Sequence, residues 1–450
     1  MSLPEGWAET TIGEAYLVIP KHPADIERGQ NVSFVPMPAV DEHLGAIVGA
    51  DDRELSEIWT GYTHFADGDV IFAKITPCME NGKAAIARNL TNGMACGSTE
   101  FYVFRPEGGV SAEYLWRYLR QQSFRDEAES HMSGAVGQRR VPRDYLENHQ
   151  LPLPPLAEQR RIVAKLDALT ARLTRARAEL DRVPVLAKRL RESVLRRVFA
   201  FEFQANCLGK TEGETEVANT SLDKLAEFNP KHAKTLDRNI SVSFVPMAAV
   251  SDVSGEIVSN TARSLSEVCT GYTHFADGDV IFAKITPCME NGKAAVVKDM
   301  IGGMGCVSTE LHVMRTGRDL RAKLLWYLLR SAGLRGVAET KMTGAVGQRR
   351  VPRKFLEGLR IQIRSLAEQD KAIRCLDAAF ARADRLEAEA AEARALLDRM
   401  EAAILARAFR GELVPQDPAD EPAHLLLDRI RTVSAAAPKP KRGRRKNVKV

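Results

Sequence analysis

Cysteine is scarce in this sequence: the seven that occur in 450 residues are an odd and widely spread set. A disulfide framework needs paired cysteines in a short, loop-rich chain, so we expect none here. Four of the cysteines form two recurring pairs, Cys78 with Cys96 and Cys288 with Cys306. His64 and His274 lie nearby, but the spacing matches no zinc module, so we expect small buried thiols and no metal.

Long apolar runs are also missing. No stretch reaches the roughly 18 apolar residues that a membrane-spanning helix needs. The first residues, MSLPEGWAETTIGE, have neither the basic segment nor the apolar segment of a signal peptide. We therefore expect a cytoplasmic protein without a membrane partner. Its 450 residues, 44% hydrophobic and 27% charged, suit a globular protein of two or more domains.

Charge of one sign does not dominate the body of the chain. The formal net charge is +5, yet the tail PKPKRGRRKNVKV (438–450) alone holds seven Lys and Arg and no acidic residue. Without it, 57 basic residues face 59 acidic ones. We interpret the tail as a disordered basic arm. An argument for DNA binding must therefore rest on local groups of residues.

Catalytic signatures are missing too. GKTEGE (209–214) lacks the upstream glycine of a phosphate-binding loop, and no dinucleotide fingerprint or amino-methyltransferase signature occurs. Asp67, Asp69 and Glu80 could serve a metal-dependent nuclease together with Lys83, but ADGD is better explained as a turn that opens a strand. We expect a binding protein with no cofactor and no catalytic residues.

What the chain does contain is a long internal repeat. TGYTHFADGDVIFAKITPCMENGKAA at 60–85 recurs unchanged at 270–295, 210 positions later. VSFVPM, STE, GAVGQRRVPR and LAEQ recur at the same offset. A period this long is no solenoid. It indicates two copies of one domain, related by a pseudo-two-fold axis if they pack alike.

Each copy divides into an α+β part, about 1–150 and 215–360, and a long helix. Short runs such as DVIFAKI and STEFYVFR have strand composition and are bounded by turn residues, whereas SAEYLWRYLRQQSF has helical spacing. The helix that follows LPLPPLAEQ carries a heptad seam, and so does its copy. The seam contains Leu166, Leu169, Leu173, Leu180, Leu190, Leu376, Leu386, Leu397 and Met400.

These two helices are expected to pair as a coiled coil. Side-chain volumes along the seam favour a parallel pair, whereas two-fold symmetry of the repeats requires an antiparallel one, and we adopt the antiparallel pair. Pro184 predicts a kink in the first helix, where the second has Arg394.

Two polar loops are the candidates for binding. KITPCMENGK and GAVGQRR combine glycine, which permits close approach, with Lys and Arg for phosphate or guanine and with Gln and Asn for adenine. Solvated loops would have such residues too, but both loops are identical in the two copies. The predicted DNA contacts are Lys74, Thr76, Asn81, Lys83, Gln138, Arg139, Arg140, Lys284, Thr286, Asn291, Lys293, Gln348, Arg349 and Arg350.

With GYTHFADGDVIFAKITPCMENGKAA, STE, GAVGQRRVP, LPLPPLAEQRRIV and ILARAFRGELVPQDPADEPA, the chain resembles the DNA-specificity subunit of type I restriction–modification systems. The resemblance implies an α+β fold with two tandem target-recognition domains separated by a pair of long antiparallel coiled-coil helices. The expected divisions are recognition domains at 1–152 and 220–362, conserved helices at 153–203 and 363–415, a linker at 204–219 and a C-terminal extension at 416–450.

The family also implies a function. Each recognition domain would read half of a bipartite DNA site, and the helices would dock two methyltransferase subunits, which motor–nuclease subunits join. S-adenosylmethionine, ATP and Mg would then be bound by partners. Because the loops are duplicated, we expect nearly identical half-sites arranged as an inverted repeat. A self-contained nuclease or methyltransferase, a stand-alone DNA-binding regulator and a coiled-coil scaffold are the alternatives.

Overall fold

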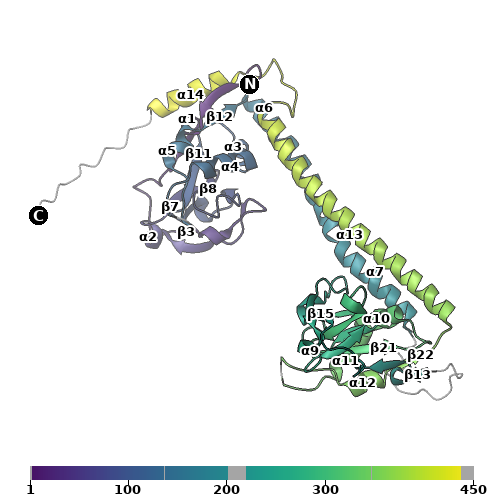
Figure 1. The fold of residues 1–450 in the computed structure, drawn as a ribbon. Coiled ribbons are helices and arrows are strands. Elements are labelled where there is room, and N and C mark those ends of the chain that lie inside the picture. Colours follow the sequence, from purple (N-terminus) through teal and green to yellow (C-terminus); the bar gives the residue numbers. More distant parts are fainter. Residues whose placement is uncertain (1–2, 136, 201–218, 346, 437–450) are drawn as a thin grey trace, which may run out of the picture. The chain divides into compact units, whose positions relative to one another are not determined.

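The computed structural model describes residues 3–135, 137–200, 219–345 and 347–436 (Figure 1). The predicted linker 204–219, except for its last residue, and the basic tail 438–450 lie outside these residues. The chain divides into two compact units: Met1–Glu179 with Ala393–Val450, here the first unit, and Leu180–Glu392, the second unit. Among the described helices, none is long and apolar enough to cross a membrane.

The first unit contains two four-stranded sheets, with strand orders β6-β3-β10-β7 and β2-β11-β8-β9, and the two-stranded sheets β1-β12 and β4-β5. The strands are β1 (Ala8–Thr11), β2 (Tyr16–Val18), β3 (Asn31–Val35), β4 (Val40–Asp41), β5 (Ala46–Ile47), β6 (Asp51–Glu54), β7 (Thr63–Ala66), β8 (Val70–Ala73), β9 (Ala84–Ile86), β10 (Met94–Gly97), β11 (Phe101–Pro106) and β12 (Gln150–Leu153). The helices are α1 (Ile12–Ala15), α2 (Leu55–Ile58), α3 (Ala112–Leu119), α4 (Gln122–Ser130), α5 (Arg143–Asn148), most of α6 (Leu156–Asp181), the end of α13 (Leu366–Phe409) and α14 (Ala423–Ala436).

The second unit repeats this topology, with orders β16-β15-β20-β17, β14-β21-β18-β19 and β13-β22. The strands are β13 (Asn219–Ser221), β14 (Ala226–Phe228), β15 (Ser241–Val245), β16 (Thr261–Ser264), β17 (Thr273–Ala276), β18 (Val280–Ala283), β19 (Ala294–Val296), β20 (Met304–Val307), β21 (Leu311–Thr316) and β22 (Arg360–Gln362). Its helices are α7 (Val183–Val198), α9 (Leu265–Val268), α10 (Ala322–Arg330), α11 (Ala332–Thr340), α12 (Arg353–Glu357) and the first part of α13. The expected duplication of an α+β domain is confirmed.

The ADGD stretch is the expected turn, here between β7 and β8. The Asp69 carboxylate accepts a hydrogen bond from the Ala66 backbone N–H at 2.7 Å and forms a bidentate ion pair with Arg105 at 2.7 and 2.8 Å. Asp279 and Arg315 repeat the pair. Because Asp69 is almost fully buried, its charge needs this partner, and the pair accounts for the retained turn.

The recurring LAEQ sequence also has a structural role. Gln159 is buried at the start of α6, where its side chain accepts from the Ser111 N–H at 3.1 Å and donates to the Pro154 carbonyl at 2.9 Å. Ser111 itself caps α3 by accepting from the Tyr114 N–H. This glutamine therefore joins the start of the long helix to the helix that covers the sheet.

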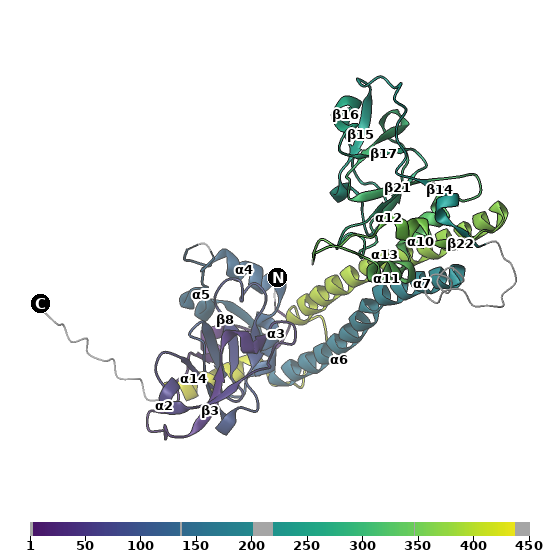
Figure 2. The same ribbon diagram turned by 90° about the horizontal axis from the view of Figure 1, so that it is seen from below.

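The long helices are antiparallel. In the second unit, Arg191 of α7 pairs with Asp384 and Glu387 at 2.5 and 2.7 Å, whereas Val198, at the end of α7, accepts a hydrogen bond from Arg364, just before α13 begins. Residues later in α7 thus contact residues earlier in the chain at α13, so the two helices run in opposite directions. Figure 2 shows α7 and α13 side by side in this unit. The parallel pairing that side-chain volume favoured is excluded.

In the first unit α6 runs beside the other end of α13. Arg177 pairs with Asp398 and Glu401 at 2.6 and 2.7 Å, and Leu166 belongs to the same buried cluster as Phe409. The first long helix is interrupted where Pro184 predicted a kink. Helix α6 ends at Asp181, and α7 begins at Val183 with the proline in its first turn.

The predicted seam residues differ in burial. Leu166, Leu173 and Leu376 are buried, and Leu169, Leu180, Leu190 and Leu397 are half-buried. Leu386 and Met400 remain 40% and 45% exposed. A strict seven-residue repeat drifts around a helix with 3.6 residues per turn, which explains why some positions of the pattern leave the contact.

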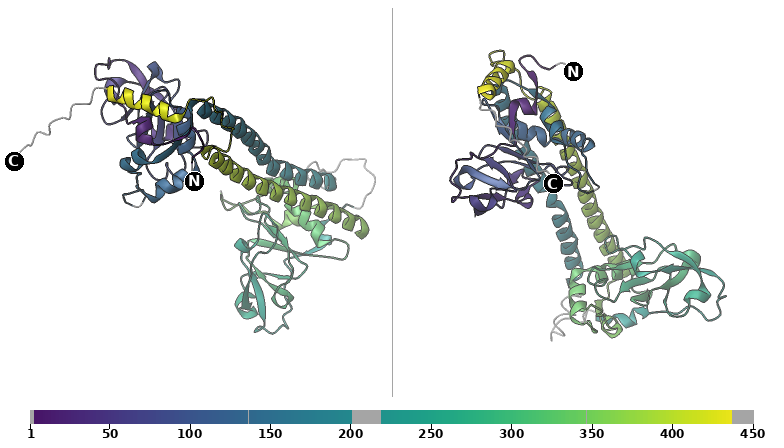
Figure 3. Two further views of the ribbon diagram at one scale, coloured as in Figure 1. Left: turned by 90° about the horizontal axis from the view of Figure 1, so that it is seen from above. Right: turned by 90° about the vertical axis from the view of Figure 1, so that its left-hand side faces the viewer.

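Each unit also combines parts of both sequence repeats. Phe409 and Ala408 at the end of α13 are buried in the first unit, whereas Leu195 and Phe199 at the end of α7 are buried in the second. Helix α14 adds Leu426 to the first core and lies on that unit in Figure 3.

Candidate DNA interface

The structure brings the two predicted loops, 74–83 and 134–140, together. The Thr76 N–H donates to the Arg139 carbonyl at 3.1 Å, and the Val141 N–H donates to the Lys74 carbonyl at 2.9 Å. In the second unit the equivalent bonds, from Thr286 to Arg349 and from Val351 to Lys284, measure 3.0 and 2.8 Å. Residues more than 60 positions apart in sequence therefore form one continuous surface in each unit.

Two arginines, Arg120 at the end of α3 and Arg125 of α4, hold loop 74–83 by hydrogen bonds to backbone carbonyls. Arg120 donates to the carbonyls of Gly82 and His43 at 3.3 and 3.0 Å, and Arg125 donates to the Glu80 carbonyl at 3.0 Å. Burial lowers the pKa of Arg120 to about 10. Neither guanidinium has an ion-pair partner among the described residues. Both arginines therefore hold the loop by hydrogen bonds to backbone carbonyls, with carboxylates such as Asp41 and Asp126 acting on them only at longer range.

The second unit repeats the Arg125 support, whereas Arg330 holds the neighbouring segment 252–254. Arg335 donates to the Glu290 carbonyl, and Arg330 donates to the carbonyls of Asp252 and Ser254 at 2.7 and 2.9 Å. Thr76 and Thr286 close the loops internally, donating to Glu80 and Glu290 at 2.9 and 2.8 Å. The two threonine hydroxyls thus hold the loop conformation.

Arg140 is tied to an acidic residue of the repeated STE sequence. Its guanidinium forms a bidentate pair with Glu100 at 2.8 and 2.9 Å, and Arg350 pairs with Glu310 at the same spacing. The arginine holds the pKa of each glutamate below its usual range. Arg140 and Arg350 therefore anchor loop 134–140 and its copy, and their charge is largely neutralised.

Four further candidates have weaker partners. Arg139 lies 3.1 Å from Glu129, and Arg349 lies 3.8 Å from Glu339. The Lys83 ammonium lies 3.5 Å from the Met37 carbonyl oxygen, and Lys293 repeats this contact at 3.4 Å.

Lys74 is half-buried beside the Tyr102 ring, whose centre is 5.2 Å from its ammonium. Burial lowers the pKa of Lys74. In the second unit His312 replaces this tyrosine beside Lys284, and burial lowers its pKa to about 4, so the imidazole is neutral. The two reading surfaces therefore differ at this position.

Among the candidate residues, the amide side chains are the ones exposed to solvent. Gln138, Gln348, Asn81 and Asn291 are all exposed. Asn81 donates weakly to Glu42 at 3.3 Å. Within the described part of the chain, the Gln138 and Gln348 amides make no hydrogen bond, so both donors and acceptors are available to a base edge.

Sequence reasoning missed the residues that support the loops. Glu100, Arg120 and Arg125 were not among the candidates, although each recurs at the offset of 210 as Glu310, Arg330 and Arg335. The repetition of STE, and of isolated arginines in otherwise diverged helices, was the signal that could have found them.

A buried cluster of His22, His64 and Cys96 brings possible metal ligands within 4.8 Å of one another. However, His64 accepts from the His22 backbone N–H at 3.4 Å and donates to the Trp59 carbonyl at 2.9 Å, while His22 donates to the Ala95 carbonyl. Burial raises the pKa of the Cys96 thiol to about 11. These contacts occupy both nitrogens of His64 and explain the cluster as packing. The absence of a metal stays a prediction.

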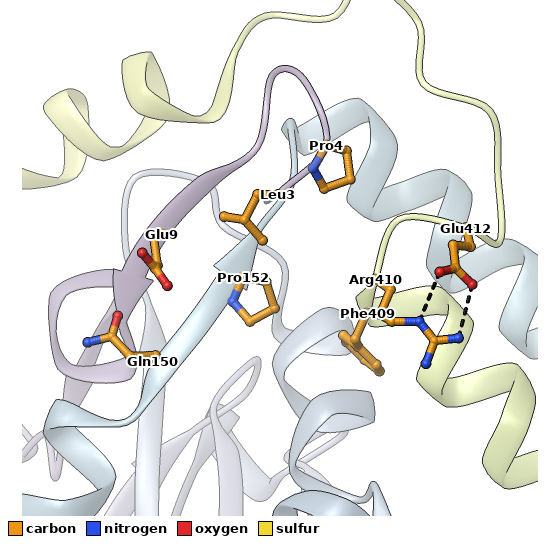
Figure 4. A pocket seen from close by; sticks show the side chains of 8 residues that line it. All are labelled: Leu3, Pro4, Glu9, Gln150, Pro152, Phe409, Arg410 and Glu412. Carbon is orange, nitrogen blue, oxygen red and sulfur yellow. Dashed lines mark hydrogen bonds and ion pairs between the residues drawn. The ribbon is translucent and has the colours of Figure 1, made fainter. Parts of the chain in front are cut away.

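A cavity of about 530 Å³ opens elsewhere in the first unit, between the start of the chain, the β1–β12 pair and the end of α13 (Figure 4). Its lining consists of Leu3, Pro4, Glu9, Gln150, Pro152, Phe409, Arg410 and Glu412. Arg410 and Glu412 pair with each other at 2.9 and 3.0 Å. The cavity therefore offers no unpaired arginine to a ligand.

Comparison with known proteins shows what this chain is similar to. A model described as the type I restriction modification DNA specificity domain matches residues 60–181. The sequence is 42% identical over 171 residues to the EcoEI specificity subunit of an Escherichia coli type I restriction enzyme, covering 37% of this chain and 28% of that protein. The StySPI specificity subunit of Salmonella potsdam is 22% identical over 466 residues, 99% of both chains. These matches support the predicted resemblance: the chain is similar to specificity subunits of type I restriction–modification systems, and residues 60–181 match their DNA specificity domain.

Two solved structures share the fold of this chain. A chain from a study of complex assembly and conformational transition of the type I R-M system gives a TM-score of 0.70 at 22% identity, covering 92% of this chain and 100% of that one. The HsdS subunit of Thermoanaerobacter tengcongensis gives 0.66 at 23% identity, covering 92% and 99%. The expected fold class is confirmed, and the names of the relatives agree with the prediction of a non-catalytic subunit.

Proposed function

We propose that this chain binds a bipartite DNA sequence and directs methyltransferase and restriction subunits to it, without catalytic activity of its own. Each recognition domain would contact one half-site through loop 74–83 and loop 134–140 or their copies. The domain limits that we expect from the sequence, 1–152 and 220–362, belong to this proposal, as does a place in the cytoplasm.

The observation that carries the proposal is the pairing of the two loops. In both units the same backbone hydrogen bonds join them, and an equivalent arginine, Arg125 or Arg335, donates to the backbone of loop 74–83 or its copy. Such a platform presents the exposed amides of Gln138 and Gln348, which suit adenine, beside Arg139 and Arg349, which suit phosphate or guanine. Rigid support of this kind is what a base-reading surface requires.

The duplicated platforms also support the prediction of related half-sites. Because the loops are identical, each unit offers the same groups to a base pair, and the two-fold symmetry expected from the sequence repeats would present them to opposite strands. The target would then be an inverted repeat with a spacer. His312 in place of Tyr102 is a difference that could alter one half-site.

Partners would supply what this chain does not. Two methyltransferase subunits would bind S-adenosylmethionine, and a motor–nuclease subunit would bind ATP and Mg. The long helices offer an extended surface for such subunits, since one face of each packs on the other and the opposite face is exposed.

Methylation mapping tests the proposal. The chain would be expressed with its cognate methyltransferase subunit in a host free of DNA methylation, and the genome read by single-molecule sequencing, with the methyltransferase subunit alone as the control. We expect a bipartite palindromic motif methylated on both strands only when the chain is present. An asymmetric bipartite motif would keep the specificity role and refute the identical half-sites. Absence of any motif would favour a stand-alone regulator.

A further inference from the structure

One end of the two sheets gathers most of the residues that the repeats share. Gly97 of β10 pairs with Val35 of β3 and with Thr63 of β7, and Phe101 of β11 pairs with Ala73 of β8. The turn 98–100 connects β10 to β11, so the end of β3, the start of β7 and the end of β8 all adjoin it. Loop 74–83 leaves from this end of the sheets.

The segments at this end are the same in both copies. They are VPM at 35–37, TGYT at 60–63, STE at 98–100, AKITPCMENGK at 73–83 and GQRR at 137–140, each repeated 210 positions later. At the opposite end, residues 86–92 read IARNLTN in the first copy and VVKDMIG in the second. The turn Asp67–Asp69 is retained there, but its carboxylates have structural partners.

Core packing does not explain all of the shared residues. Thr60, Gly61, Tyr62 and Thr99 are exposed in the first unit, and their copies are exposed in the second. Tyr62 is 38% exposed, and its copy Tyr272 is 37% exposed. An exposed tyrosine in an unchanged loop indicates contact with something outside the chain.

An arginine lies beside this tyrosine in each unit. The Arg53 guanidinium lies 4.1 Å from the centre of the Phe34 ring, and Tyr62 packs edge-on against the same ring at 5.1 Å between centres. Arg263, Phe244 and Tyr272 repeat the arrangement at 4.6 and 4.9 Å.

Arg53 is unusual in its surroundings. Its strand reads DDRE, whereas the copy reads TARS, so the arginine alone is retained among four exposed positions. Among the described residues, neither Arg53 nor Arg263 has a carboxylate partner, whereas the arginines of loop 134–140 and its copy do. Stacking on phenylalanine leaves the guanidinium edge free to donate hydrogen bonds.

We propose that Tyr62, Arg53 and Thr99, with their copies Tyr272, Arg263 and Thr309, form a second contact with the DNA backbone, beside the loops that read bases. Tyrosine and threonine hydroxyls and arginine are frequent donors to phosphate oxygens. The contact rests on the proposed function, because the same strand end would face each half-site. It would set the position of the recognition domain on the duplex without reading sequence.

The test compares charge removal at the two ends of the sheets. Arg53→Gln with Arg263→Gln removes two positive charges from the proposed contact. Arg88→Gln with Lys298→Gln removes two from the opposite end, where these equivalent residues form exposed ion pairs with Glu113 and Glu256. Each variant would be assembled with the methyltransferase subunit, and its affinity measured from low to high salt. The probes are a duplex carrying the motif from methylation mapping and a scrambled duplex.

We expect the first variant to weaken binding to both duplexes and to reduce the slope of log affinity against log salt by about 1.8, which corresponds to two lost phosphate contacts. The second variant should keep the wild-type slope. Tyr62→Phe with Tyr272→Phe, which removes only hydroxyl groups, should weaken binding about tenfold or more and leave the slope unchanged. Thermal unfolding at the wild-type temperature would show that each variant is folded.

Equal slopes for the two charge variants, together with full affinity of the Tyr→Phe variant, would overturn the inference. Loss of assembly with the methyltransferase, with unchanged DNA affinity of the complex that does form, would also overturn it and assign the surface to a protein partner. If the wild-type complex binds both duplexes equally, the proposed function itself fails, and this inference with it.

Discussion

Replacing Phe409 by alanine should destabilise the first unit, although Phe409 lies in the second sequence repeat. Its ring is buried and lies 5.1 and 5.2 Å from the ring centres of Tyr114 and Tyr118 on α3. Phe199, which occupies the equivalent place 210 positions earlier, is buried in the core of the second unit. Each phenylalanine therefore completes the hydrophobic core of the unit whose α+β domain comes from the other sequence repeat.

The expected effect is large. Removing a buried phenylalanine ring costs about 3–5 kcal/mol, because the cavity that remains adds to the lost burial. For a unit of this size, each 1 kcal/mol lowers the unfolding temperature by about 2–4 °C, so a drop of about 6–20 °C follows. Loss of the contact should also release the end of α13 from α3.

Hydrogen exchange of the full chain, followed by mass spectrometry, can assign the effect to one unit. Phe409→Ala should speed exchange in β11 and α3 and leave β21 protected, and Phe199→Ala should do the reverse. Met400→Ala is the matched control, since this α13 side chain is 45% exposed and its loss should change stability by less than about 0.5 kcal/mol. If Phe409→Ala loosened the second unit, or both units equally, the assignment of the helix ends would be wrong.

Lys83→Ala with Lys293→Ala should weaken binding to all DNA sequences and reduce the salt slope by about 1.8, measured by titration at several salt concentrations; an unchanged slope would remove both lysines from the interface. Gln138→Ala with Gln348→Ala should relax one base position in each half-site, a discrimination of about 1–3 kcal/mol, seen with a panel of singly substituted duplexes; intact preference would place base reading elsewhere. Asp69→Asn should cost about 3–5 kcal/mol in urea unfolding, because it breaks the buried pair with Arg105, and a wild-type midpoint would contradict that structural role.

The loops show where sequence reasoning stops. Their polar residues and exact repetition indicate binding, but the sequence pattern predicts the same role for Arg140 and Arg139. Only the folded chain brings Glu100, 40 positions away, to 2.8 Å from Arg140 and thereby makes that arginine an anchor. Which charges are neutralised depends on residues that are distant in sequence, and the periodicity of the sequence does not reveal such contacts.

The sequence by itself determined the duplication, the α+β class, the two long helices and the turn at ADGD, because each depends on composition, period or local turn chemistry. Its evidence on the direction of the helix pair was divided, since side-chain volumes favoured parallel packing and the symmetry of the repeats favoured the antiparallel pair that we adopted. Tertiary structure decided this through ion pairs such as Arg191 with Glu387. It also decided that Phe409 and Phe199 each complete the core that the other repeat begins, because burial depends on which surfaces meet in space.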